Sequence, residues 1–179
     1  MGYPFRSRLE HDPLGTVAVI QMKDIDDTNV LQGQQPIRVA LPTGKAHHLL
    51  REGDLLFRSR GKSNGAALVH QRVGTAVLAA PLLLIRPHRI LPEYLCWYLN
   101  SPTTQVQLAA LSEGTSVRMI SAETLKALDV PLPSRPAQQA IAHAATMAER
   151  ERVLVTRVST LRQQLTTHLL MTFAQRTAE

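Results

Sequence analysis

The sequence from Pro136 to Glu179 reads PAQQAIAHAATMAERERVLVTRVSTLRQQLTTHLLMTFAQRTAE. Apolar residues recur in it at steps of three or four, which is the period of a helix with one apolar stripe. The members of this stripe are Leu154, Val158, Leu161, Leu165 and Leu169. No glycine or proline follows Pro136, and proline is tolerated in a first helical turn. The segment therefore predicts one long helix, in which about 38 residues span roughly 57 Å.

A helix of this length cannot bury its apolar stripe against one small domain. It needs a long partner, most simply a second long helix in a coiled coil. The alternative is a C-terminal helix that folds partly back on its own domain. The pattern favours the helix that seeks a long partner.

Length and composition limit the class of protein. A chain of 179 residues, 44% hydrophobic, fits one soluble globular domain, or one domain and an appendage. It has no apolar run long enough for a membrane span and no apolar signal core near its start, so we expect a cytoplasmic protein. The single cysteine, Cys96, lies in an apolar segment and is expected to be a buried, reduced thiol. Without a Cys/His cluster at ligand spacing, we expect no metal and no cofactor.

The positive charge is concentrated in the middle of the chain. The net charge is +6, and most of the excess lies between residues 51 and 90. That stretch carries Arg51, Arg58, Arg60, Lys62, Arg72, Arg86 and Arg89 against Glu52 and Asp54. A local basic patch suggests a polyanionic partner such as nucleic acid. A solvated basic surface is the alternative.

The first 135 residues predict a mixed α/β domain. Apolar and β-branched runs indicate strands at 17–22, 36–41, 55–57 and 77–86. Capping residues and first-turn prolines indicate helices at 92–99, 102–111 and 122–127. Aspartates 24, 26 and 27 lack the spacing of a calcium loop and are interpreted as a polar turn. The aromatic residues of 92–99 are expected in the core. The fold class is thus α+β, with domain 1–135 followed by the helix 136–179.

A basic loop follows the predicted strand at 55–57 and reads Arg58-Ser59-Arg60-Gly61-Lys62-Ser63-Asn64-Gly65. Its glycines allow the backbone to approach a partner closely. Arginine can pair with guanine edges or phosphates, and asparagine can pair with adenine. The Gly-Lys-Ser element lacks the upstream glycine of a nucleotide phosphate loop. A structural hairpin loop with a basic surface is the alternative.

Four stretches in a fixed order resemble the target recognition domain of the specificity subunits of type I restriction–modification systems. They are residues 53–61 (GDLLFRSRG), 91–95 (LPEYL) with 99–101 (LNS), 114–115 (GT) with 120–121 (IS), and 130–133 (VPLP) leading to Gln138 and Ile141. The resemblance covers most of the chain from about residue 50 onward. The family usually has Pro, Leu and Glu where this chain has Ser134, Arg135 and Ala137, so the junction with the helix is altered.

The resemblance implies half of a specificity subunit. Family members typically carry two recognition domains, held apart by two antiparallel helices, so that each domain reads one half of a split DNA target. This chain has one domain and one helix. Two copies could therefore pair their helices antiparallel and read a gapped palindrome. Pairing with a different half-subunit would give an asymmetric target instead.

The resemblance also implies partners and a contact set. Double-stranded DNA would be bound by the recognition domain, while methyl transfer and cleavage would belong to separate methyltransferase and restriction subunits. This chain would be non-catalytic, and its long helix would also bind the methyltransferase. The expected DNA contacts are Arg58, Arg60, Lys62, Ser63, Asn64, Thr115, Ser116 and Arg118.

Two other functions remain open from the sequence. The first is a small nuclease that would use Glu52, Asp54 and Lys62, although their spacing matches no known cluster. The second is a scaffold that pairs through the long helix and binds no DNA.

Overall fold

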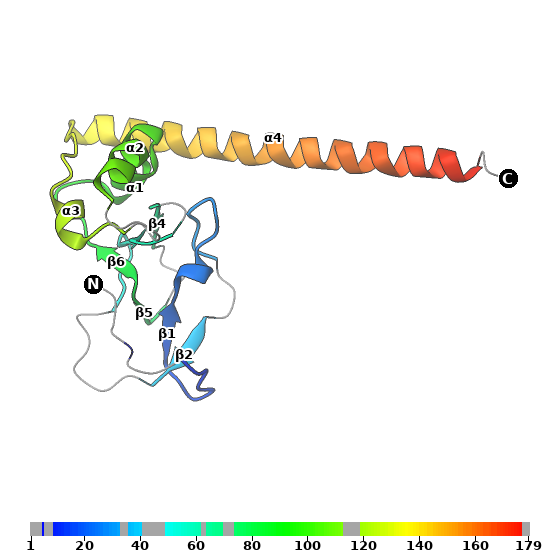
Figure 1. The fold of residues 1–179 in the computed structure, drawn as a ribbon. Helices are drawn as coiled ribbons and strands as arrows, with labels where there is room; N and C mark the ends of the chain where they lie inside the picture. The colour runs from blue at the N-terminus through cyan, green and yellow to red at the C-terminus, as the bar shows by residue number, and fades with distance from the viewer. Residues whose placement is uncertain are drawn as a thin grey trace. The chain divides into compact units, whose positions relative to one another are not determined.

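The computed structural model describes residues 5, 9–32, 36–40, 49–61, 64–69, 74–112 and 119–176. The chain divides into two compact units, Met1–Gln138 and Gln139–Glu179 (Figure 1). The first unit contains small β-sheets and short helices, and the second contains most of one long helix. The predicted α+β class with a long C-terminal helix is therefore confirmed.

Two three-stranded sheets form the first unit. One has the order β2-β1-β5, in which β1 pairs antiparallel with β2 and parallel with β5. The other has the order β4-β3-β6, in which β3 pairs antiparallel with both neighbours. The strands are β1 (Val17–Ile20), β2 (Ile37–Val39), β3 (Leu55–Arg58), β4 (Ala66–Leu68), β5 (Ala76–Leu78) and β6 (Leu82–Ile85).

The central strand β3 is buried on both of its faces. Side chains alternate across a strand, so Leu56 points one way and Leu55 and Phe57 point the other. Leu56 packs in a cluster drawn from both sheets, with Ile20 and Leu78 among its members. Leu55 and Phe57 pack in a second cluster that also contains residues of the helices. This two-sided burial explains why β3 is apolar without interruption before Arg58.

The predicted single strand 77–86 is wrong, because the structure has two strands there. β5 ends at Leu78 and β6 begins at Leu82, with Pro81 between them. Proline has no backbone N–H and cannot donate to a strand ladder. The interruption lets the chain leave one sheet and enter the other, since β5 and β6 belong to different sheets.

The short helices begin where the sequence predicts. They are α1 (Pro92–Asn100), α2 (Pro102–Leu111) and α3 (Ala122–Lys126). The Ser101 hydroxyl accepts a hydrogen bond from the Thr104 backbone N–H at 3.3 Å, and the Ser121 hydroxyl accepts one from Thr124 at 3.0 Å. Both serines therefore act as N-caps. A short 3-10 helix, η1 (Met22–Asp24), occupies the end of the predicted first strand.

The aromatic residues of α1 are only partly in the core. Tyr94 is buried and donates its hydroxyl to the Pro131 carbonyl at 3.0 Å. Tyr98 donates to the Asp129 carbonyl at 3.0 Å, so both tyrosines hold the extended segment before the long helix. Trp97 is 38% exposed, and the expectation that it is a core residue is wrong.

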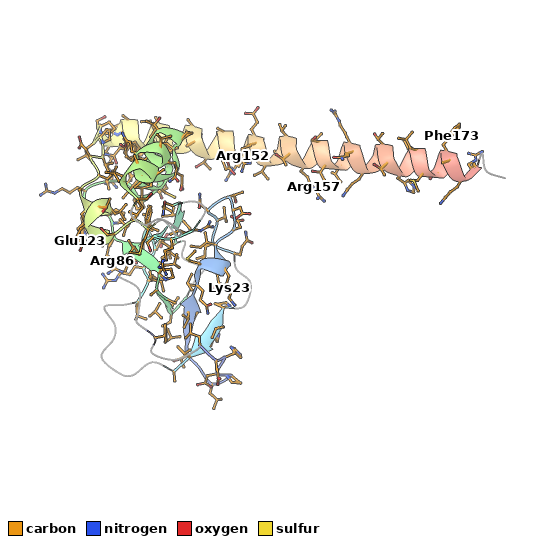
Figure 2. The ribbon with its side chains drawn as sticks, in the orientation of Figure 1. Lys23, Arg86, Glu123, Arg152, Arg157 and Phe173 are labelled. Atoms are coloured by element: carbon orange, nitrogen blue, oxygen red, sulfur yellow. The ribbon has the colours of Figure 1, made fainter. Side chains whose placement is uncertain are left out.

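The long helix α4 runs from Arg135 to Arg176, which is 42 residues or roughly 63 Å. The buried Gln138 fixes its first turn. Its side-chain oxygen accepts from the Leu91 backbone N–H at 2.8 Å, and its amide nitrogen donates to the Pro133 carbonyl at 2.9 Å. Side chains from residue 146 to residue 176 are all exposed, and Figure 2 shows them along the helix. Among the described residues, no helix is apolar enough over a sufficient length to cross a membrane.

Cys96 is expected to react slowly with alkylating reagents in the folded protein. Its thiol lies against the Ala66 carbonyl, and burial raises the pKa of Cys96 to about 11. A free cysteine has a pKa of about 8.5, so the thiolate fraction of Cys96 at pH 8 is smaller by a factor of roughly two hundred. Iodoacetamide labelling followed by mass spectrometry should be slow in buffer and fast in urea. Equal rates in the two conditions would contradict this prediction.

Candidate nucleic-acid interface

Two segments that are far apart in the sequence meet at one edge of the first unit. Arg60 follows β3 and forms an isolated antiparallel bridge with Met119. The Ile120 backbone N–H donates to the Ser59 carbonyl at 2.9 Å, next to this bridge. Met119 is where the second predicted contact segment, which contains Thr115 to Arg118, rejoins the described chain. The fold therefore places Met119, the residue that follows Arg118 in the sequence, next to Arg60 of the basic loop.

Two amide side chains attach the basic loop to the helices behind it. Asn100, the last residue of α1, accepts from the Ala66 N–H at 2.9 Å and donates to the Ala66 carbonyl at 2.8 Å. Gln105 of α2 donates to the Asn64 carbonyl at 3.0 Å. The sequence analysis predicts no role for these two amides. For Asn100, the signal in the sequence is an amide at the last position of a mostly apolar helix.

A second loop packs closely against the basic loop. Asn29, at a left-handed φ of 61°, donates its side-chain amide to the Asn100 side-chain oxygen at 3.2 Å. A Cβ atom added at Gly65 would lie 2.0 Å from the Asn29 side-chain oxygen. A side chain at position 65 would therefore displace the Asn29 side chain and its hydrogen bond to Asn100.

Arg58 belongs to the interior, which corrects its place in the expected DNA contact set. Arg58 is only 8% exposed. Its guanidinium donates hydrogen bonds to the Ile25 carbonyl at 2.9 Å and to the Asp26 carbonyl. A guanidinium committed to two backbone carbonyls is not available to a phosphate or a base. Arg58 therefore holds the 25–32 loop against β3.

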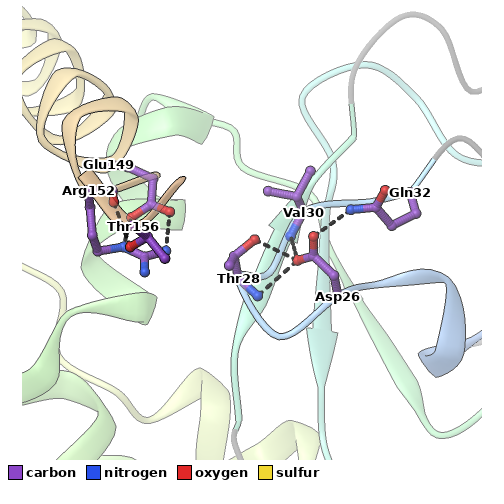
Figure 3. A network of polar contacts seen from close by, with 7 residues as sticks. All are labelled: Asp26, Thr28, Val30, Gln32, Glu149, Arg152 and Thr156. Atoms are coloured by element: carbon purple, nitrogen blue, oxygen red, sulfur yellow. Dashed lines mark hydrogen bonds and ion pairs between the residues drawn. The ribbon is translucent and has the colours of Figure 1, made fainter. Parts of the chain in front are cut away.

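The loop that Arg58 holds is organised by Asp26 (Figure 3). The Asp26 carboxylate accepts hydrogen bonds from the backbone N–H groups of Thr28 and Val30, each at 2.9 Å, and from the side chain of Gln32. Partial burial tends to raise the pKa of Asp26, but these hydrogen bonds outweigh it and leave the pKa below its ordinary value. The segment is thus the polar turn that the sequence predicts.

A second arginine of the basic stretch is also used internally. Arg86 forms a two-pronged ion pair with the buried Asp54, with both nitrogen–oxygen distances at 2.7 Å. The hydrogen bonds to Asp54 raise the pKa of Arg86, so it stays charged. Within the described ranges, the arginines of this stretch that remain exposed are Arg51, Arg60 and Arg89. The basic surface is therefore smaller than the composition suggests.

The remaining expected contacts are only partly visible. Asn64 is half-buried, and its side-chain amide donates to the Arg58 carbonyl at 3.0 Å, which closes the hairpin loop. Lys62, Ser63, Thr115, Ser116 and Arg118 lie outside the described residues. Among the described residues of the expected contact set, Arg60 is the cation whose side chain is exposed.

The fold of this chain is similar to that of part of an HsdS subunit of known structure. The crystal structure of the HsdS subunit from Thermoanaerobacter tengcongensis matches 86% of this chain with a TM-score of 0.65 and 24% identity. A structure concerned with complex assembly and conformational transition of the type I R-M system matches 88% with a TM-score of 0.67 and 22% identity. No known family model matches the sequence, and neither does any curated protein.

These similarities establish the fold, and the resemblance predicted from the four motifs is confirmed at that level. The chain spans 40% and 41% of the lengths of the two proteins it matches, so it corresponds in size to about half of such a subunit.

Proposed function

We propose that this chain is a sequence-specific DNA-binding specificity subunit of a type I restriction–modification system, equivalent to half of a full-length subunit. It reads one half of a bipartite target and directs partner methyltransferase and restriction subunits, and it has no catalytic role of its own. The observation that carries the proposal is the bridge between Arg60 and Met119 on a domain with the HsdS fold. This bridge lies between the two polar segments of the expected contact set, residues 58–64 and 115–118. We call the DNA-contacting surface that these segments would form the proposed edge.

The proposed contact set is the one expected from the sequence, without Arg58. Arg60 is exposed and forms the bridge with Met119. Lys62, Ser63, Thr115, Ser116 and Arg118 belong to the two sequence segments that flank these residues. Cations would fix the domain on phosphates, and a few polar side chains would read base edges. Asn64 remains in the set as a residue that shapes the loop. The side-chain amides of Asn100 and Gln105 bond to the backbone of residues 66 and 64, and they would hold the basic loop in a defined position.

The nuclease alternative is poorly supported by the position of Asp54. This carboxylate is 1% exposed and accepts from the Arg51 backbone N–H and from both prongs of Arg86. Its oxygens are therefore occupied by hydrogen-bond donors of the chain itself. Across the described ranges, no group of three His, Cys, Asp or Glu side chains is close enough to hold a metal ion. No specific observation favours the scaffold alternative.

Replacing Arg60 and Lys62 together by alanine should weaken binding to duplex DNA by roughly 10- to 100-fold, because two cations of the proposed edge are lost. The slope of log K against log salt should also fall by about one to two for the two lost phosphate contacts. Fluorescence anisotropy with a labelled random-sequence duplex measures both, with and without the methyltransferase subunit.

Arg38→Ala is the matched control, since Arg38 is an exposed arginine on β2 of the other sheet. It should leave binding within about twofold of the parent protein. Equal affinities for the parent and the double variant, in the presence of the methyltransferase, would contradict the proposed edge.

We further propose that α4 pairs antiparallel with a second copy of itself, which would separate two recognition domains along a duplex. The support is the exposure of the five predicted stripe residues, which lie between 47% and 65% exposed in the chain. A helix from a different half-subunit is the alternative partner.

A further inference from the structure

The exposed part of α4 has a seam with a seven-residue repeat. One set of seam positions is Met147, Leu154, Leu161 and His168, and the other is Glu151, Val158, Leu165 and Thr172. All of them are exposed in the structure. The centre of the seam, from Leu154 to Leu165, is purely apolar, while Glu151 lies before it and His168 lies after it. An acidic residue, Glu151, therefore lies on one side of the apolar centre, and a basic residue, His168, lies on the other.

We propose that two copies of α4 pair in one specific antiparallel register, in which Leu154 packs against Leu165 of the second copy and Val158 packs against Leu161. This inference rests on the antiparallel pairing proposed above and specifies it. The two-fold axis would pass between Ser159 and Thr160. In an antiparallel coiled coil, one set of seam positions faces the other set, and this register satisfies that requirement at every layer.

The register places Glu151 opposite His168 of the second copy, once on each side of the axis. A carboxylate facing an imidazole forms a hydrogen-bonded pair whether the histidine is neutral or charged. Parallel pairing would instead place Glu151 against Glu151 and His168 against His168. Charge complementarity therefore favours the antiparallel arrangement, and buried polar layers commonly fix register in coiled coils.

Shifting the register by one repeat removes this match. With Leu154 against Val158, Glu151 would face Leu161, and a carboxylate would be buried against an apolar side chain. With Leu161 against Leu165, His168 would face Val158 and Leu154 would face Thr172. The first shift keeps the number of purely apolar layers but leaves Glu151 without a polar partner. The second shift leaves fewer purely apolar layers and gives His168 no polar partner. Each of these unpartnered polar groups costs free energy.

The positions that flank the seam agree with the same register. Arg157 would lie near Gln164 of the second copy, and Arg162 would lie near Val155, so the arginines of the two helices do not meet. Ala148 would lie near Leu169, which accounts for the fifth residue of the predicted stripe. Glu149 and Arg152 form an ion pair within one helix, at 2.5 Å (Figure 3). Both residues occupy positions of the seven-residue repeat that are outside the seam.

Paired cysteines test the register directly. In the variant Leu154→Cys plus Leu165→Cys, each new thiol would face its counterpart on the second copy, and air oxidation should give a covalent dimer on a non-reducing gel. The yield should exceed that of either single variant by at least about tenfold. The two positions lie roughly 16 Å apart on one rigid helix, so a bond within one chain is excluded. Wild-type protein controls for the partly buried Cys96.

Each other outcome has a defined meaning. Efficient cross-linking of Leu154→Cys alone would show parallel pairing and overturn the proposal. Stronger cross-linking of Leu154→Cys plus Val158→Cys, or of Leu154→Cys plus Thr172→Cys, would show a shifted register and overturn it as well. A protein that is monomeric by light scattering would refute the helix pairing itself, whereas DNA binding is measured separately and reports on the recognition domain.

An exchange of the polar pair provides a second test. His168→Glu alone would place two carboxylates opposite each other on both sides of the axis and should weaken the dimer by roughly tenfold. Adding Glu151→His should restore most of that loss, because the pair is re-formed in reverse. If the double variant is as weak as the single one, Glu151 and His168 do not face each other.

Discussion

The variant Leu161→Asp plus Leu165→Asp is expected to be a monomer under conditions in which the parent protein is a dimer. In the proposed register these two residues contribute to all four central layers, since each faces a seam residue of the other copy. Each substitution removes about 2 kcal/mol of apolar burial and places a carboxylate in an apolar layer. The dissociation constant should rise at least about a thousandfold, and multi-angle light scattering at micromolar concentration measures the change.

Gln163→Asp plus Thr167→Asp is the matched control. These residues have the same spacing on α4 but lie on the side away from the seam, and both are exposed. The control variant should remain a dimer, although it adds the same two negative charges to the helix as the test variant. If both variants become monomers, charge on the helix rather than the seam is responsible, and the pairing proposal fails.

Local sequence signals predicted the elements of this fold well. The helices of the first unit begin at Pro92, Pro102 and Ala122 because each start depends on one proline or one capping serine. The long helix needs only a period of three to four residues and the absence of glycine and proline. These signals act over a few residues, so they can be interpreted without knowledge of the fold.

The site could be predicted only in part, because its geometry depends on distant contacts. Arg58 and Arg60 look equivalent in the sequence. Arg58 is nevertheless the last residue of β3, and the carbonyls that bind it come from Ile25 and Asp26 in another loop. In the same way, the bridge between Arg60 and Met119 has no local signature. The motif order indicated the family fold without showing which cations face outward.

The interruption at Pro81 shows the same limit within the core. The run from Val77 to Ile85 has the composition of one buried strand, and hydrophobicity does not distinguish one strand from two. The structure uses the proline to move the chain from the first sheet to the second. Pro81 is the residue that indicates the break between the two strands, because proline cannot donate to a strand ladder. The continuous apolar composition gives no sign of this break.

The two arginines at the end of β3 should respond in opposite ways to alanine substitution. Arg58→Ala removes donors from two carbonyls and leaves a space in the interior, so it should lower the free energy of unfolding of the recognition domain by about 2–4 kcal/mol. Arg60→Ala removes an exposed side chain and should change that free energy by less than about 0.5 kcal/mol. Urea unfolding followed by circular dichroism and tryptophan fluorescence measures both variants.

The DNA affinities of the same variants complete the comparison. At a temperature where both are folded, Arg60→Ala should bind duplex DNA several-fold more weakly, while Arg58→Ala should bind nearly as well as the parent. Arg58→Lys should recover only part of the stability, because an ammonium group cannot reproduce the planar array of guanidinium donors. If Arg58→Ala keeps the parent stability but loses DNA binding, Arg58 leaves the interior to contact DNA, and its assignment as a structural residue is wrong.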